Sequence, residues 1–107
     1  MGSNQHLQQL FRKNLPLFNA LGDSTRQQLI MHMMDGEPKS VKELTAMTDL
    51  SRPTISHHLK ILRDAHIIKE NVQGRKTFYT PQLGDYYYSL KEFIDTIETL
   101  TQTEEVT

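Results

Sequence analysis

Residues 51–80 concentrate side chains that can donate hydrogen bonds to negatively charged groups. This segment carries six Lys or Arg residues against two Asp or Glu residues, a net charge of +4. Ser51, Arg52 and Thr54 stand together at its start, where each can donate to phosphate oxygens or to the edges of bases. These residue types indicate anion binding, and a nucleic acid is the candidate partner.

A predicted helix positions these groups. Ile55, Leu59 and Leu62 are spaced at i, i+4 and i+7, which predicts a narrow apolar stripe that packs inward. Ser51 is the expected N-cap, and Pro53 fits the first turn because its missing N–H costs nothing there. The opposite face is polar and hydrogen-bonding, and consists of Pro53, Thr54, Ser56, His57, Lys60 and Asp64.

A predicted hairpin carries a second group of cations. Residues 67–80 are rich in β-branched and aromatic side chains, and Gln73 and Gly74 interrupt them as a turn. Arg75 and Lys76 lie at the tip of this hairpin. Two cations beside a glycine suit contact with phosphates or entry into a minor groove.

A second helix is predicted immediately before the polar helix. Ser40 followed three residues later by Glu43 fits a capping box, so a short helix is expected to start at Val41. Only a tight turn separates it from the cap at Ser51. Residues 40–64 therefore predict a helix-turn-helix, in which the second helix projects as a rod that fits the DNA major groove.

Further helices are predicted nearer the ends of the chain. The first covers residues 1–14, and Pro16 is expected to interrupt it; another follows Asp23 as its N-cap. The last covers residues 85–101, with a polar end from Thr101 that is expected to fray. Their apolar positions recur at helical spacing and include Leu7, Leu10, Phe11, Tyr87, Leu90, Ile94 and Ile97.

The order of elements predicts a winged helix-turn-helix: mainly α, with a small β-hairpin, in a single domain over residues 1–107. With 36 % hydrophobic residues the core is thin, so association with a second copy is a plausible source of further burial. The formal net charge of −1 taken alone argues against a nucleic-acid partner. This near-zero value arises because the net charge of −5 on residues 81–107 offsets the +4 on residues 51–80.

Several classes of function are excluded by what the sequence lacks. It contains no Cys, which rules out disulfides, thiolate metal sites and thiol redox sensing. The absence of a long apolar run and of a secretory signal pattern indicates a cytoplasmic protein. No nucleophile and base pair, phosphate-binding glycine loop or carboxylate dyad appears at a meaningful spacing, so no enzymatic activity is expected.

Two segments resemble the ArsR/SmtB family of bacterial winged-helix repressors. Residues 20–26 (ALGDSTR) are similar to the opening motif of that family, and residues 51–62 (SRPTISHHLKIL) to its recognition helix, while Gly74 and Arg75 match its wing tip. The resemblance implies a sequence-specific, double-stranded DNA-binding transcriptional regulator. It assigns DNA contact to Ser51, Arg52, Thr54, Ser56, His57 and Lys60, and the wing role to Arg75 and Lys76.

The resemblance also implies a homodimer formed through the first and last helices. The residues expected at its interface are Leu7, Leu10, Phe11, Tyr87, Leu90, Ile94 and Ile97. Two recognition helices would then enter successive major grooves about 34 Å apart, so the operator of this repressor is expected to be an inverted repeat.

The chain departs from the family where metal-sensing members bind their inducer. Residues 43–50 (ELTAMTDL) lack the cysteines found there, and Asp85 is followed by three tyrosines, with no His beyond His66. Neither metal site of the family is expected, and no cofactor is predicted. His66 stands where relatives have Gly, which predicts a left-handed backbone conformation.

Other interpretations stay open. The domain could be a protein-interaction module that does not bind DNA, although the +4 segment counts against this. A divergent metal site could join His6 and His32 to a carboxylate such as Glu98 or Glu104 across a dimer. His57 and His58 point about 100° apart on a helix, which disfavours a shared zinc ion. The methionines at 31, 33, 34 and 47 are interpreted as residues that fill the core rather than as metal ligands. Tyr86, Tyr87 and Tyr88 are interpreted as interface aromatics rather than as the lining of an effector pocket.

Overall fold

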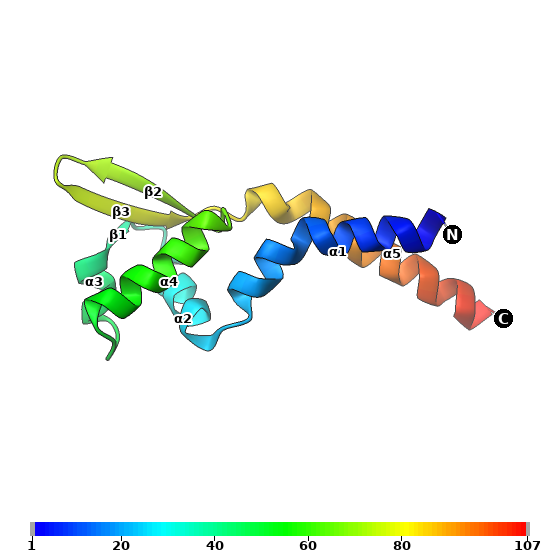
Figure 1. The fold of residues 1–107 in the computed structure, drawn as a ribbon, viewed down its shortest axis with the longest axis horizontal. Helices are drawn as coiled ribbons and strands as arrows, with labels where there is room; N and C mark the ends of the chain where they lie inside the picture. The colour runs from blue at the N-terminus through cyan, green and yellow to red at the C-terminus, as the bar shows by residue number, and fades with distance from the viewer. Residues whose placement is uncertain (1, 107) are drawn as a thin grey trace.

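The computed structural model describes residues 2–106, and the side chains of residues 4–102. Its elements, drawn in Figure 1, are α1 (Gly2–Leu21), α2 (Ser24–His32), β1 (Lys39–Ser40), α3 (Val41–Ala46), α4 (Arg52–Asp64), β2 (Ile68–Gln73), β3 (Lys76–Pro81), a 3-10 turn (Gly84–Tyr86) and α5 (Tyr87–Val106). The strands form an antiparallel sheet in the order β1-β3-β2. The predicted fold class, mainly α with a small β-hairpin, is confirmed.

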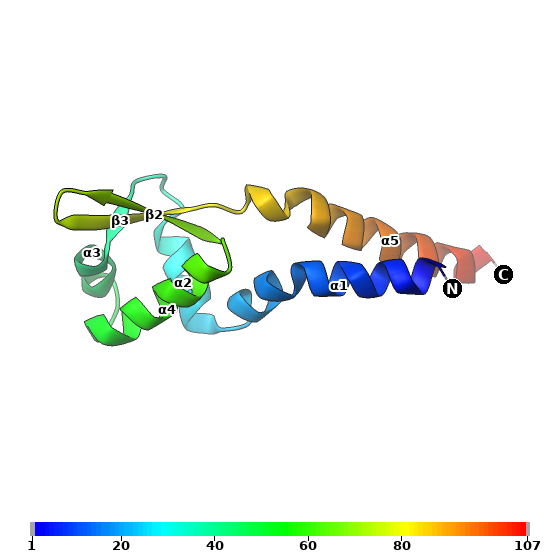
Figure 2. The same ribbon diagram turned by 45° about the horizontal axis from the view of Figure 1, so that its top comes forward.

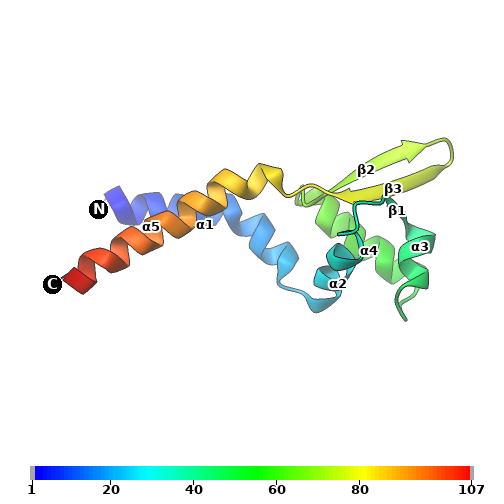
Figure 3. The ribbon, with the colours of Figure 1, turned by 180° about the vertical axis from the view of Figure 1, so that it is seen from behind.

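The molecule is elongated, with extents of 59 × 26 × 22 Å. Its radius of gyration of 17.4 Å exceeds the value of about 13 Å expected for a compact chain of about 100 residues. Helices α2, α3 and α4 and the sheet form a head, whereas α1 and α5 pack against each other as an arm (Figure 2). The arm and the tip of the β2–β3 hairpin lie at opposite ends of the long axis (Figure 3).

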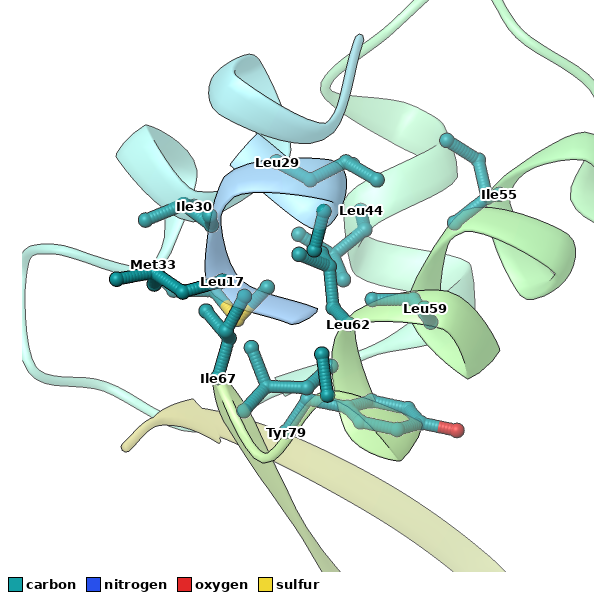
Figure 4. Packing of buried hydrophobic residues seen from close by; sticks show 13 residues of the cluster. Leu17, Leu29, Ile30, Met33, Leu44, Ile55, Leu59, Leu62, Ile67 and Tyr79 are labelled. Atoms are coloured by element: carbon teal, nitrogen blue, oxygen red, sulfur yellow. The ribbon is translucent and has the colours of Figure 1, made fainter. Parts of the chain in front are cut away.

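The core of the head forms where the apolar faces of its helices meet. Ile55, Leu59 and Leu62 of α4 are at most 1 % exposed, which confirms the predicted stripe. They pack with buried residues of α2, α3, β2 and β3, of the segments that follow α2 and α4, and of the C-terminal end of α1, among them Leu17, Leu29, Met33, Leu44, Ile67 and Tyr79 (Figure 4). The face of α4 opposite these three residues is exposed to solvent.

The helices of the head begin where local side chains satisfy their first N–H groups. The Asp23 carboxylate accepts from the N–H of Arg26 at 3.0 Å. Ser40 and Glu43 form the reciprocal capping box, with both bonds at 3.1 Å. The three predicted N-caps, Ser51 included, are confirmed.

Acid is expected to destabilise the head through two of its carboxyl groups. The backbone N–H of Ser40 lowers the pKa of Glu43 below its ordinary value of 4.5, and the Lys39 ammonium lowers that of Asp35 below 3.8. Because the unfolded chain binds protons more readily, this stability is present above those ordinary values and is lost as pH falls through the lowered ones. Urea unfolding followed by circular dichroism at pH 7 and pH 3 measures the loss. Glu43→Gln is expected to show a smaller drop than the parent, and an equal drop would contradict the assignment.

The prediction that Pro16 interrupts the first helix is wrong. α1 continues from Gly2 through Pro16 to Leu21, and Figure 1 shows it changing direction along its length. A proline inside a helix removes one backbone hydrogen bond and bends the helix. Leu17 and Ala20, at most 3 % exposed, anchor the part beyond the proline to the core, so the helix is retained.

Other differences arise at the ends of elements. The sequence does not predict β1, because two residues give no periodic pattern; it pairs Lys39 with Tyr79 and widens the hairpin to three strands. The interpretation of Met31, Met34 and Met47 as core residues is wrong, since they are 71 %, 59 % and 43 % exposed; Met47 lies just beyond the end of α3. α5 continues to Val106, five residues past the predicted end at 101. Within residues 2–106, no helix has the length and apolarity needed to cross a membrane.

Candidate nucleic-acid interface

The first turn of α4 projects from the head and carries exposed polar groups. The Ser51 hydroxyl accepts the N–H of Thr54 at 3.3 Å, and the two hydroxyl oxygens lie 2.9 Å apart. Each of these hydroxyls is therefore partly occupied by the cap. Arg52, next to the cap, is exposed, so its guanidinium extends into solvent at the positive end of the helix dipole.

The outer face of α4 continues this polar surface. Ser56, His57 and Lys60 are exposed, while Thr54 is half-buried. All lie on the side of the helix away from the buried stripe of Ile55, Leu59 and Leu62. A helix held by one face and polar on the other can enter a major groove without disturbing the core.

The wing, residues 68–81 of β2 and β3, ends in a two-residue turn. Gln73 pairs with Lys76, so the turn consists of Gly74 and Arg75, one residue later than predicted. Gly74 has a φ of 64°, which a glycine adopts without steric cost at the first central position of a hairpin turn. Arg75 and Lys76 are exposed at this tip.

A groove of about 660 Å³ joins the start of α4 to the wing. Glu43 also lines it, but the carboxylate is occupied by the N–H of Ser40. The cations that line the groove come from α3, α4 and the hairpin: Lys42, Arg52, Arg75 and Lys76. The fold thus brings together Arg52 and both wing cations, whereas Ser56, His57 and Lys60 lie further along α4 and outside the groove. Lys42 was missed, because only the packing of α3 places it there.

His58 is half-buried and lies beside Arg26. The Arg26 guanidinium approaches His58 Nδ1 at 3.3 Å and donates to the carbonyls of Ala20 at 2.7 Å and Asn19 at 3.2 Å. Arg26 therefore satisfies the C-terminal end of α1 and touches the recognition helix at once. The predicted left-handed residue after α4 is confirmed, since His66 has a φ of 61°.

Of the residues expected at a dimer interface, some are buried within one chain of the arm and others stay exposed. Leu10 is 3 % exposed and Leu90 packs against the core, so both are used within one chain. Apolar side chains that stay exposed on the arm, of which only Leu15 was not predicted, are Phe11, Leu15, Tyr87, Tyr88, Ile94 and Ile97. Leu7 is half-buried.

A buried polar pair fixes the register of α1 against α5. Asn14, with 0 % exposure, receives a hydrogen bond from the Ser89 hydroxyl at 2.8 Å and donates to the Ser89 carbonyl at 3.1 Å. Phe93 packs edge-on against Phe11 at a centroid distance of 4.9 Å. Tyr86 donates its hydroxyl to the Ala65 carbonyl, which ties the start of the arm to the end of α4.

Within one chain, the histidines of the described residues do not assemble a metal site, and a site shared between two copies stays a prediction. His6 pairs with Glu92 at 2.9 Å rather than with Glu98, and the side chain of Glu104 lies outside the described residues. His32 lines a different groove, beside Met31 and Met47. Among side chains 4–102, no group of three His, Asp or Glu residues is close enough to hold an ion.

The fold and the basic surface define a winged helix-turn-helix domain, and comparison with known proteins agrees. A model of the bacterial regulatory protein arsR family matches residues 23–70. The transcriptional repressor SdpR of Bacillus subtilis is 31 % identical over 64 residues, covering 60 % of this chain and 70 % of SdpR. An uncharacterized HTH-type transcriptional regulator of Methanocaldococcus jannaschii is 33 % identical over 69 residues, covering 64 % and 78 % of the two chains. The crystal structure of an ArsR family transcriptional regulator superposes with a TM-score of 0.73 at 23 % identity, covering 85 % and 92 %.

The chain belongs to the arsR family of bacterial regulatory proteins. It is therefore a DNA-binding transcriptional regulator and not an enzyme, as the sequence predicted.

Proposed function

We propose that this protein is a homodimeric repressor that binds an inverted-repeat operator in the cytoplasm. The observation that carries the proposal is the groove where Arg52 of α4 meets Arg75 and Lys76 of the wing. Cations on two elements that face one groove can hold a phosphate backbone while α4 enters the adjacent major groove. SdpR, a relative of this chain, is itself a transcriptional repressor.

A second copy of the chain is the occupant that suits the arm. The arm is two helices thick and extends away from the head, so it cannot enclose all of its own apolar side chains. Phe11, Tyr87, Ile94 and Ile97 remain exposed on it. A symmetric pairing of two arms would cover these residues and place one head at each side, which suits two half-sites of DNA.

The residues proposed to contact DNA have separate roles. Ser51 and Thr54, with the N–H groups at the start of α4, suit a phosphate oxygen. Ser56, His57 and Lys60 continue along the exposed face and suit base edges and the far strand. Arg52 stands between the two groups, and the wing pair, Arg75 with Lys76, suits the flanking backbone or the minor groove.

The proposal does not include an inducer that binds as a metal ion at the sites used by metal-sensing relatives. The sequence has no Cys to supply a thiolate, and no His follows His66 to complete a site on α5. The only imidazole in the described arm, that of His6, is paired with Glu92.

The proposal is tested by Arg52→Ala and Lys60→Ala. Fragmented genomic DNA of the host retained by the purified protein supplies the operator, and a mobility-shift titration measures affinity at two salt concentrations. Each variant is expected to lose about 1–3 kcal/mol of binding free energy, because an exposed cation on the DNA-facing side is removed. Lys91→Ala is the matched control, since it removes a cation from α5 rather than from α4.

Two outcomes would contradict the proposal. If Arg52→Ala and Lys60→Ala bind as the parent does, the assignment of the interface is wrong. If the parent shows no salt-dependent DNA binding at all, the domain is better described as a protein-interaction module.

A further inference from the structure

On the side of β2, the wing is supported by the head only along its inner half. On β2, Ile68 and Glu70 lie on the face toward α4, and Ile68 is 2 % exposed. Val72, the next residue on that face, is 66 % exposed, so it lies beyond the cover of α4. The pair formed by Glu70 and Tyr79 is therefore the outermost rung at which the side of the hairpin facing α4 is covered; one residue further out, only β1 contacts the hairpin, by pairing Ser40 with Phe78.

Glu70 is held from both sides at that rung. Arg63, in the last turn of α4, donates from Nη1 to the two Glu70 carboxylate oxygens at 3.3 and 3.2 Å. Tyr79, opposite Glu70 on β3, donates its hydroxyl to Oε2 at 3.4 Å. The ring of Tyr79 packs into the core while its hydroxyl oxygen points out of the cluster (Figure 4). Glu70 thus links the recognition helix to both strands of the wing.

At neutral pH, the protonation states of Arg63 and Tyr79 let both donate hydrogen bonds to the Glu70 carboxylate. Burial, and then the neighbouring Glu70 charge, raise the pKa of Tyr79, so its hydroxyl remains a donor at neutral pH. Hydrogen bonds to Asp64 and then to Glu70 raise the pKa of Arg63. Asp64 accepts from Nε and Nη2 at 3.3 and 3.1 Å, which orients the guanidinium so that Nη1 faces β2.

The tip depends on this rung for its direction. It lies three residues further along each strand, roughly 10 Å away at about 3.3 Å per residue. A tilt of about 20° at the rung would move the tip by roughly 3–4 Å over that length, which is enough to break a hydrogen bond to a phosphate. Residues 71–76 are all exposed. Beyond the rung, only Thr77 and Phe78 of β3 are half-buried, and Phe78 pairs with Ser40 of β1, so β2 itself has no packing there that opposes such a tilt.

We infer that Glu70, clamped between Arg63 and Tyr79, is a positioning residue for DNA binding: it fixes the wing relative to α4 so that both reach the duplex together. This inference rests on the proposed function. It runs against simple electrostatics, which predicts that removing an acidic group beside a DNA-binding surface leaves affinity unchanged or raises it.

Two substitutions at one position separate positioning from simple electrostatics. Glu70→Ala and Glu70→Gln remove the same charge, but only glutamine keeps an oxygen that can accept from Arg63 and Tyr79. In the mobility-shift titration, Glu70→Ala is expected to bind the operator about three- to tenfold more weakly, with a salt slope smaller by about 0.9 for each phosphate that the wing no longer reaches. Glu70→Gln is expected to stay close to the parent.

A double-mutant comparison excludes general damage to the fold. The variant carrying Arg75→Ala and Lys76→Ala lacks the wing cations, so adding Glu70→Ala to it is expected to cause no further loss of affinity. Damage unrelated to the wing would add to the loss. Asp49→Asn is the control for charge, because it removes an exposed carboxylate from the turn before α4.

A measurement without DNA tests the same positioning directly. Because the chain has no Cys, a nitroxide can be placed at the wing alone through Gln73→Cys. Its spectrum is expected to show greater mobility in the Glu70→Ala background than in the parent or Glu70→Gln.

The inference is overturned if Glu70→Ala binds as tightly as Glu70→Gln, or if the spectra coincide. If the parent itself shows no salt-dependent DNA binding, the proposed function fails and this inference fails with it. If the parent binds DNA and Glu70→Ala binds it equally well, only this inference fails.

Discussion

Ile94→Glu is expected to convert the protein to a monomer that no longer retains its operator. Ile94 is 54 % exposed on α5, in the apolar face of the arm that the dimer is proposed to bury. In a symmetric dimer the substitution introduces two carboxylates, each of which would lose its hydration without gaining a partner. Such a buried unpaired charge costs several kcal/mol, so the dimer dissociation constant is expected to rise about a hundredfold or more.

Loss of the dimer should remove most of the affinity for DNA. Two linked heads gain a factor of about 10² to 10⁴ over one head, because the second binding event is intramolecular. Analytical ultracentrifugation measures the oligomeric state, and a mobility shift measures binding. Ile94→Val is the matched control at the same position and should behave as the parent. A variant Ile94→Glu that sediments with the parent would show that this face is not the interface.

Leu59→Ala is expected to cause the largest loss of stability. Leu59 is 1 % exposed on the inner face of the recognition helix, among the side chains of the core (Figure 4). Truncation removes its apolar burial and leaves a cavity that the surrounding helices fill only partly, at a cost of about 3–5 kcal/mol. That is a large share of the roughly 5–15 kcal/mol that holds a domain of this kind folded.

The neighbouring residue supplies the control for Leu59→Ala. Lys60 is exposed, so Lys60→Ala should change the free energy of unfolding by less than about 0.5 kcal/mol while it weakens DNA binding. Urea unfolding of both variants at the same protein concentration, followed by circular dichroism, keeps the contribution of dimer dissociation equal in the two measurements. A loss below about 1 kcal/mol for Leu59→Ala would mean that α4 does not pack on the core as described.

Features governed by near neighbours in the chain were predictable from the sequence. The capping box of Ser40 and Glu43, the cap at Ser51 and the stripe of Ile55, Leu59 and Leu62 are all present in the structure. Each depends on bonds or spacings within a turn or two of helix, which the residue types alone specify.

Pro16 shows where that local reasoning failed. Its type predicts a break, but the burial of Leu17 and Ala20 against the head outweighs the missing hydrogen bond, and α1 continues. The same holds for Leu10 and Leu90, whose spacing does not reveal that they pack within one chain rather than between two.

The sequence by itself determined the kinds of helix and hairpin, where most of them begin, and which residues could bind an anion. Only the tertiary structure decided that Lys42 and Arg52 share one groove with the wing cations, and that Glu70 joins the wing to Arg63. The physical reason is distance along the chain. Caps and periodic stripes are settled by bonds between near neighbours, whereas these groups meet only after the core has packed and fixed the elements that carry them.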